Sequence, residues 1–147
     1  MPSPTANTAQ TPLTCIMPIK SAADAAALAQ ILPKAKPAVD KALDSIGTVH
    51  FARFVFLQNN TQLAIITTFD GTFPQYITDF ANGIGDISNT LSQHVSDPPP
   101  LPVQQHVKEF IAWVEAHDAP HVGFYSAYPM LEVQDIRPMA ASAGSGD

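Results

Sequence analysis

The stretch VHFARFVFL-QNNT-QLAIITTF, residues 49–69, decides the fold. Residues 49–57 and 62–69 are dense in β-branched and aromatic side chains, and a short polar segment with two asparagines separates them. Two such runs joined by a short polar segment are typical of an antiparallel β-hairpin. The sequence therefore predicts two neighbouring strands in the middle of the chain.

The region before the hairpin predicts a strand and a helix. The apolar run 13–19 is suited to a buried strand. The alanine-rich sequence between Ser21 and Gly47 predicts a helix, because Ser is a preferred N-cap and Gly a natural C-terminal stop. Pro33 and Pro37 interrupt the helical pattern, so we expect a break or a kink there.

The region after the hairpin predicts two helices and a last strand. Thr72 begins a capping box with Pro74 in the first turn, and apolar residues at three- and four-residue steps continue the helix to Leu91. A second apolar stripe over residues 103–114 predicts another helix. Residues 121–133 are strand-like.

The element order is therefore strand, helix, strand, strand, helix, extra helix, strand. This is the βαββαβ order of a ferredoxin-like α+β fold with a helix inserted before the last strand. The alternative is another α+β sandwich with one antiparallel sheet. We expect one domain over residues 12–137 and disordered tails at 1–11 and 138–147, because both ends are rich in small polar residues with Pro or Gly.

The chain termini and the cysteine count bear on localisation. The first dozen residues have neither the basic nor the apolar region of a signal peptide, and no apolar run has the length of a transmembrane helix. Cys15 stands alone, which excludes an intrachain disulfide and a multi-cysteine metal site. The sequence therefore favours a cytoplasmic protein.

The charge content is low and its balance is acidic. Only 14% of the 147 residues are charged, with 7 Lys and Arg against 13 Asp and Glu, for a net charge of −6. An average soluble domain has about 25% charged residues. Nucleic acids and anionic membrane surfaces both attract basic patches. We therefore expect neither as a partner.

Both faces of the predicted hairpin are apolar. Phe54 lies on one face of residues 49–57 and Phe51 on the other, each among further apolar side chains. A sheet with helices on one face leaves its second face exposed, and large exposed apolar patches are rare in monomers. We therefore expect a second subunit to cover this face in a two-fold homodimer. The alternative is that the inserted helix folds across it.

The segment VHFARFVFLQNN…LAIITTFDGTFPQYITDFANGIG, residues 49–85, resembles the dimeric α/β-barrel superfamily. More narrowly, it resembles small uncharacterised bacterial proteins with an HFARF strand followed by an FDG turn and a helix. The resemblance implies two ferredoxin-like sheets paired face to face, with a pocket in each subunit. The superfamily includes cofactor-free monooxygenases, haem-degrading enzymes, dye-decolourising peroxidases, muconolactone isomerases and many proteins of no known activity, and a shared fold transfers none of these functions.

His50 and Arg53 are the candidate catalytic residues. An arginine in an apolar strand is costly without a partner, so Arg53 either forms an ion pair with Asp70 or Asp79 or holds an anionic ligand such as a carboxylate or a haem propionate. His50 is either structural or a general base or axial haem ligand. An offset of three places the two on opposite faces of a regular strand, and only a bulge joins them in one site.

Four further residues are candidates for ligand binding. Phe54 shares the predicted face of His50, and Asp70 ends the second strand of the hairpin. Tyr76 and Tyr125 can line a pocket and donate hydrogen bonds, with core packing as an equal alternative. We expect the ligand to be a small apolar or aromatic molecule.

Two classes of function stay open. The first is a small-molecule-binding protein with an oxidoreductase activity like that of a monooxygenase or a haem peroxidase, in which case haem is a possible cofactor. The second is a non-catalytic domain that binds an apolar ligand or serves as an oligomeric scaffold. No metal site is predicted, because the run HDAPH at residues 117–121 contains a proline that breaks any helical His-x3-His pair and favours a polar turn.

Overall fold

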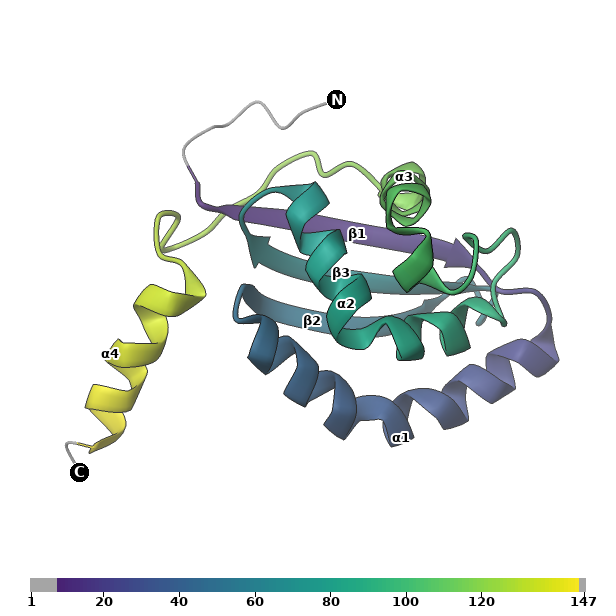
Figure 1. Cartoon of the computed structure of the whole chain (residues 1–147), viewed down its shortest axis with the longest axis horizontal. Coiled ribbons are helices and arrows are strands. Elements are labelled where there is room, and N and C mark those ends of the chain that lie inside the picture. The colour runs from purple at the N-terminus through teal and green to yellow at the C-terminus, as the bar shows by residue number, and fades with distance from the viewer. Residues whose placement is uncertain (1–7, 146–147) are drawn as a thin grey trace.

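The computed structural model describes residues 8–145 (Figure 1). Its elements, in chain order, are β1 (Gln10–Pro18), α1 (Ala22–Ile46), β2 (Val49–Leu57), β3 (Gln62–Asp70), α2 (Phe73–Ser92), the short 3-10 helix η1 (Val103–Gln105), α3 (Val107–His117) and α4 (Val133–Ser145). No helix in this part of the chain has the length and apolar character needed to cross a membrane.

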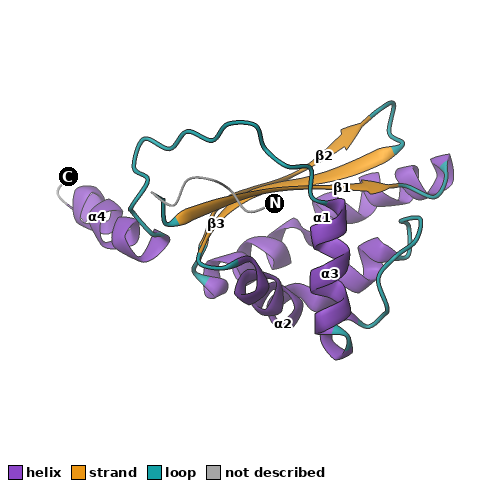
Figure 2. Ribbon diagram, turned by 90° about the horizontal axis from the view of Figure 1, so that it is seen from above, coloured by secondary structure: helices purple, strands orange, loops and turns teal. Residues whose placement is uncertain are grey.

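The three strands form one antiparallel sheet in the order β1-β3-β2. The strand β3 is therefore central, and β1 and β2 lie at the edges. Figure 2 shows α1, α2 and α3 together on one face of the sheet, which we call the inner face. In the described part of the chain no helix covers the other face, which we call the outer face.

The predicted hairpin is confirmed as β2 and β3. The pairing runs from Val49 opposite Phe69 to Leu57 opposite Gln62. Three consecutive turn residues, Gln58, Asn59 and Asn60, have positive φ angles of 55°, 54° and 63°. Asparagine tolerates this left-handed conformation better than most residues, which explains why the Asn-rich segment can form the turn.

The predicted helix ends are also confirmed. The side chain of Ser21 accepts a hydrogen bond from the N–H of Asp24 at the start of α1, and Gly47 ends the helix with a φ of 75°. Thr72 caps α2 by accepting from the N–H of Gln75 at 3.3 Å, with a proline in the first turn. These caps satisfy backbone groups that the first and last helical turns leave without intrahelical partners.

The prolines of α1 bend the helix without breaking it. The helix α1 is continuous through Pro33 and Pro37, and Figure 1 shows it curving away from the sheet in its middle. A proline inside a helix removes one backbone N–H and crowds the carbonyl one turn earlier, which produces a bend of this kind.

The hydrophobic core lies between the inner face and the three helices. The strands β1 and β3 bury alternate residues against α2, as the two-residue period of a strand requires. The largest fully buried side chains are Phe69, Leu28, Leu63, Val95 and Val103.

The predicted ferredoxin-like βαββαβ fold with an extra helix, and with it the dimeric α/β barrel, is wrong. The structure is α+β with three strands in residues 8–145, and the predicted last strand at residues 121–133 does not form. In its place, residues 119–132 run irregularly along β1 and then lead into α4 (Figure 1). We call residues 119–132 the edge segment.

The proline at position 12 explains why no fourth strand pairs with β1. Both the N–H and the C=O of Thr14 point to the edge segment, where they bond Asp118 Oδ1 and the N–H of Ala119. Residues two apart in a strand present their backbone groups to the same side, so Pro12 faces the same edge and has no N–H to donate there. A regular fourth strand would leave a carbonyl without a donor opposite Pro12.

The helix α4 packs at the end of the sheet and contacts the C-terminal end of α1. Gln134 donates from Nε2 to the carbonyl of Gly47 at 2.8 Å, and Arg137 bonds the side chain of Asp44 at 2.8 Å. The helix includes residues 138–145, which the sequence assigned to a tail, and β1 includes residues 10 and 11. The rest of the predicted tails, residues 1–7 and 146–147, lies outside the described residues.

Candidate functional site

His50 lies in a β-bulge and forms a buried pair with Asp70. The register of β2 against β3 shifts between Val49 and Phe51, so His50 is the extra residue of β2. Its Nε2 donates a hydrogen bond to Oδ1 of Asp70 at 2.6 Å. The two side chains are only 6% and 5% exposed. Each of the two buried polar side chains therefore has a hydrogen-bond partner in place of water.

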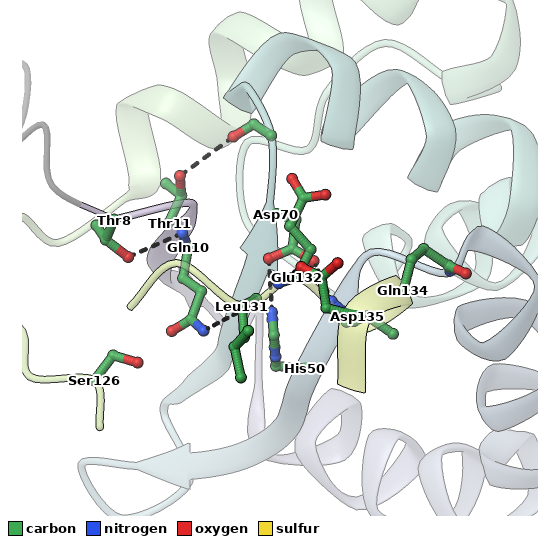
Figure 3. Close-up of polar contacts among 12 residues, drawn as sticks. Thr8, Gln10, Thr11, His50, Asp70, Ser126, Leu131, Glu132, Gln134 and Asp135 are labelled. Carbon is green, nitrogen blue, oxygen red and sulfur yellow. Dashed lines mark hydrogen bonds and ion pairs between the residues drawn. The ribbon is translucent and has the colours of Figure 1, made fainter. Parts of the chain in front are cut away.

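The pair belongs to a polar cluster that connects the sheet to the C-terminal part of the chain (Figure 3). Asp70 accepts a second hydrogen bond, at Oδ2, from the N–H of Val133 at 2.7 Å. Gln10 lies opposite Asp70 in the register of β1 and donates from Nε2 to two carbonyls of the edge segment at 3.1 and 3.0 Å. This cluster anchors the edge segment and the start of α4.

Arg53 lies on the edge strand β2 and forms neither predicted ion pair. Asp70 is engaged by His50, and Asp79 accepts a hydrogen bond from Gln75 Nε2 at 2.9 Å. The side chain of Arg53 is exposed and forms no hydrogen bond or ion pair with residues 8–145. It borders a groove on the inner side of β2 and a shallow depression on the outer face.

The groove beside Arg53 is mainly apolar. Its volume is about 550 Å³, and it lies between α1 and the inner side of β2. Its apolar walls are formed by Ala29, Leu32, Pro33, Val39, Leu43, Ala52, Phe54 and Phe56. The charged residues that border it are Lys36, Asp40 and Arg53. We call this hollow the α1–β2 groove.

The bend of α1 explains why the groove is open. The residues that α1 contributes recur at three- and four-residue steps from Ala29 to Leu43, so they form one stripe on the helix. Pro33 belongs to this stripe, and a proline inside a helix bends it. The stripe therefore faces β2 without closing against it.

Phe54 is a wall of this groove, but the other predicted ligand-binding residues lie elsewhere. Tyr76 is buried in the core, where its ring stacks on Phe69 with centroids 4.0 Å apart, and burial raises the pKa of its hydroxyl to about 12. Tyr125 lies on the edge segment and is 87% exposed. Asp70 is in the buried pair described above. The candidate residues thus occupy four separate places.

The region around Cys15 has a packing role. Burial, and next the negative charge of Asp118, raise the pKa of the Cys15 thiol to about 12. Burial also raises the pKa of Asp118, although its carboxylate accepts a hydrogen bond from the N–H of Thr14 at 3.0 Å. A thiol held in its neutral form is a weak nucleophile.

No group of three or more His, Cys, Asp or Glu side chains gathers at a potential metal site within residues 8–145.

No family model, curated protein or solved structure matches this chain. The resemblance of residues 49–85 to dimeric α/β-barrel proteins therefore stays a prediction, and the function has to be inferred from geometry.

His50 does not fit the predicted role of an axial haem ligand. The Nε2 of His50 is already bonded to Asp70, and its side chain is buried. Asp70 follows the core residue Phe69 in β3, so the pair lies away from the inner face that bears Phe54 and the groove.

The contribution of α1 to the groove was not predicted from the sequence. Leu32, Val39 and Leu43 line it, together with the ion pair between Lys36 and Asp40. The three- and four-residue spacing of these positions was available in the sequence. The prolines were interpreted only as interruptions, and their effect on the distance between α1 and β2 is a tertiary one.

Proposed function

We propose that this chain binds a small apolar molecule in the α1–β2 groove. The observation that carries the proposal is the groove itself, a hollow of about 550 Å³ with apolar side chains on both walls. Sites for small molecules are concave and mostly apolar, with volumes of about 300–1,000 Å³ and few polar groups. The α1–β2 groove has each of these properties.

The two walls offer complementary contacts to a ligand. Phe54 and Phe56 project from β2 on the same side, because side chains two residues apart share a face of a strand. Leu32 and Leu43 face them from α1. A ligand between the walls replaces water against the rings and the aliphatic side chains, and the hydrophobic effect favours this by about 25 cal/mol for each Å² of apolar surface removed from water.

The proposal is for binding without a catalytic step in the groove. Its titratable side chains are those of Lys36, Asp40 and Arg53, and the first two form an ion pair with each other. His50, the predicted general base, is held by Asp70 outside the groove. Of the two function classes that the sequence leaves open, the non-catalytic binding domain therefore has the stronger support.

The experiment is to fill the groove with a larger side chain. Ala29 lies on the groove and is exposed, so Ala29→Trp places an indole ring in the ligand's space. Ala38→Trp is the matched control, because Ala38 is exposed on the same helix and lines a different hollow, towards α2. The probe is the neutral fluorophore N-phenyl-1-naphthylamine. It is excited directly, so that the new tryptophans do not contribute to the measured fluorescence.

We expect the wild type and Ala38→Trp to bind the fluorophore with equal affinity. Ala29→Trp should bind at least about tenfold more weakly, which corresponds to about 1.4 kcal/mol. Equal binding by all three proteins, or no binding by the wild type, contradicts the proposal. Circular dichroism of each variant checks that the fold is intact.

We propose in addition that the chain forms a homodimer through the outer face of its sheet. The three packed helices all lie on the inner face (Figure 2), and Phe51 on the outer side of β2 is 77% exposed. Ile66 lies beside Arg53 in the register of β3 and lines the same shallow depression as Phe51. A second copy would remove this apolar surface from water.

A further inference from the structure

Arg53 holds the uncompensated positive charge beside the α1–β2 groove. Its guanidinium bonds no residue within the range 8–145, and the two aspartates predicted as partners are engaged elsewhere. Lys36 also borders the groove, but its ammonium group pairs with the carboxylate of Asp40 one helical turn later. The three charged residues that line the groove therefore sum to one net positive charge.

This local charge opposes that of the chain as a whole. The sequence carries a net charge of −6, with only 7 basic residues. An arginine on an apolar edge strand loses hydration if a ligand covers it, and an anion compensates that loss best. A guanidinium binds a carboxylate through two parallel N–H···O bonds, which a single ammonium group cannot form.

We propose that the ligand of the α1–β2 groove is an apolar carboxylic acid in its anionic form. Its hydrocarbon body lies between the walls of α1 and β2, and its carboxylate binds the guanidinium of Arg53 at the rim. The inference rests on the proposed function, because it names the chemical class of the ligand for the same groove.

A different role for Arg53 makes a different prediction. Charged residues on edge strands prevent a second strand from pairing there, and β2 is an edge strand with a bulge, which has the same effect. If Arg53 only prevents strand pairing at the edge of the sheet, its replacement promotes aggregation and leaves the relative affinities for different ligands unchanged. The carboxylate proposal requires that the relative affinity for anionic and neutral ligands changes.

The test compares three probes with the same ten-carbon chain: decanoate, decanol and decyltrimethylammonium, each below its micellar concentration. Calorimetry measures their affinities for the wild type, Arg53→Gln, Arg53→Lys and the control Lys34→Gln, which removes an exposed charge of α1 outside the groove. We expect the wild type to bind decanoate about tenfold more tightly than decanol and the cationic probe most weakly.

Arg53→Gln should lose the preference for decanoate and keep the affinity for decanol. Arg53→Lys should retain part of the preference, which should decrease with added salt, and Lys34→Gln should behave as the wild type. Equal affinities of the wild type for decanoate and decanol overturn the carboxylate inference and leave the proposed function standing. If none of the three probes binds the wild type, the proposed function fails, and the inference fails with it.

Discussion

Asp70 accepts hydrogen bonds from two groups that are distant in the sequence. His50 belongs to β2, and Val133 is the first residue of α4. Asp70→Ala leaves both buried donors without an acceptor. Hydrogen bonds to charged groups contribute about 1.5–3 kcal/mol each. We therefore expect the substitution to lower the free energy of unfolding by about 3 kcal/mol, measured by urea denaturation.

The control for Asp70 is a carboxylate at the surface. Glu109 is 54% exposed in its side chain and lies 3.8 Å from His106. Exposed pairs contribute about 0–1 kcal/mol, so Glu109→Ala should change the stability by less than Asp70→Ala. A loss of stability that is the same in both variants would show that the buried pair does not anchor α4.

The thiol of Cys15 predicts a loss of stability at alkaline pH. Burial raises its pKa from 9.0 to about 12, so the folded chain holds the proton more tightly than the unfolded chain does. The stability from this group is complete below pH 9 and is lost as the pH rises towards 12, by about 1.4 kcal/mol for each pH unit at most. We expect the wild type to lose its advantage over Cys15→Ala between pH 9 and 11.

Urea unfolding of both proteins at pH 8, 9, 10 and 11, with a reductant present, measures this effect. The comparison cancels the lysines, which titrate in the same range in both proteins. A difference in stability that stays constant from pH 8 to 11 would mean that the thiol is accessible to solvent in the folded state.

The residue scale also shows where prediction from sequence reached its limit. His50, Arg53, Phe54 and Asp70 were candidates from the sequence, and each has a definite place in the structure. The bulge that places His50 against Asp70 could not be predicted, because a bulge depends on how one strand pairs with its neighbour. Because the pairing of β2 with β3 was not known from the sequence, neither Asp70 nor Asp79 could be chosen or excluded as the partner of Arg53.

At the scale of elements, the bend of α1 controls the width of the groove. Pro33 removes a helical hydrogen bond, and a proline inside a helix costs about 3 kcal/mol relative to alanine. We expect Pro33→Ala to reduce the bend of α1, although Pro37 remains. It should raise the free energy of unfolding by about 1–2 kcal/mol and weaken binding of N-phenyl-1-naphthylamine as the groove narrows. Thermal unfolding and the fluorescence titration measure the two effects.

The control is the proline of the first turn of α2. Pro74 lies at a position where the backbone N–H has no intrahelical partner, so proline is tolerated there. Pro74→Ala should therefore neither stabilise the chain by a comparable amount nor change the binding of the fluorophore. If Pro33→Ala stabilises the chain without weakening binding, the bend is not what keeps the groove open.

Elements with local determinants were predicted well, and the element without them was not. The caps at Ser21, Gly47 and Thr72 and the two strands of the hairpin depend on neighbouring residues, and all are confirmed. The strand predicted at residues 121–133 depended on pairing with β1, where Pro12 lacks a donor on the free edge. A segment of strand-like composition forms a strand only if a neighbouring strand offers it backbone hydrogen bonds.

At the scale of the whole molecule, the low charge content and the exposed outer face are connected. Only 14% of the residues are charged, and all three packed helices lie on one side of the sheet. The edge segment runs along β1, so it leaves the outer side of β2 uncovered. Phe51 lies on this side, and Arg53 borders both this side and the α1–β2 groove. A chain with few charges gains from a second copy on this surface, because burial there removes apolar area that no helix of its own protects.

The proposed homodimer predicts a mass of twice 15.7 kDa by light scattering at micromolar concentration. Phe51→Lys places a second positive charge beside Arg53 in the proposed interface, where burial of two like charges is costly. We expect this variant to have the monomer mass with its secondary structure intact. The control Met139→Lys adds the same charge on α4, where the side chain is also exposed, and should stay dimeric. A monomeric wild type, or dimers of both variants, contradicts dimerisation through the outer face.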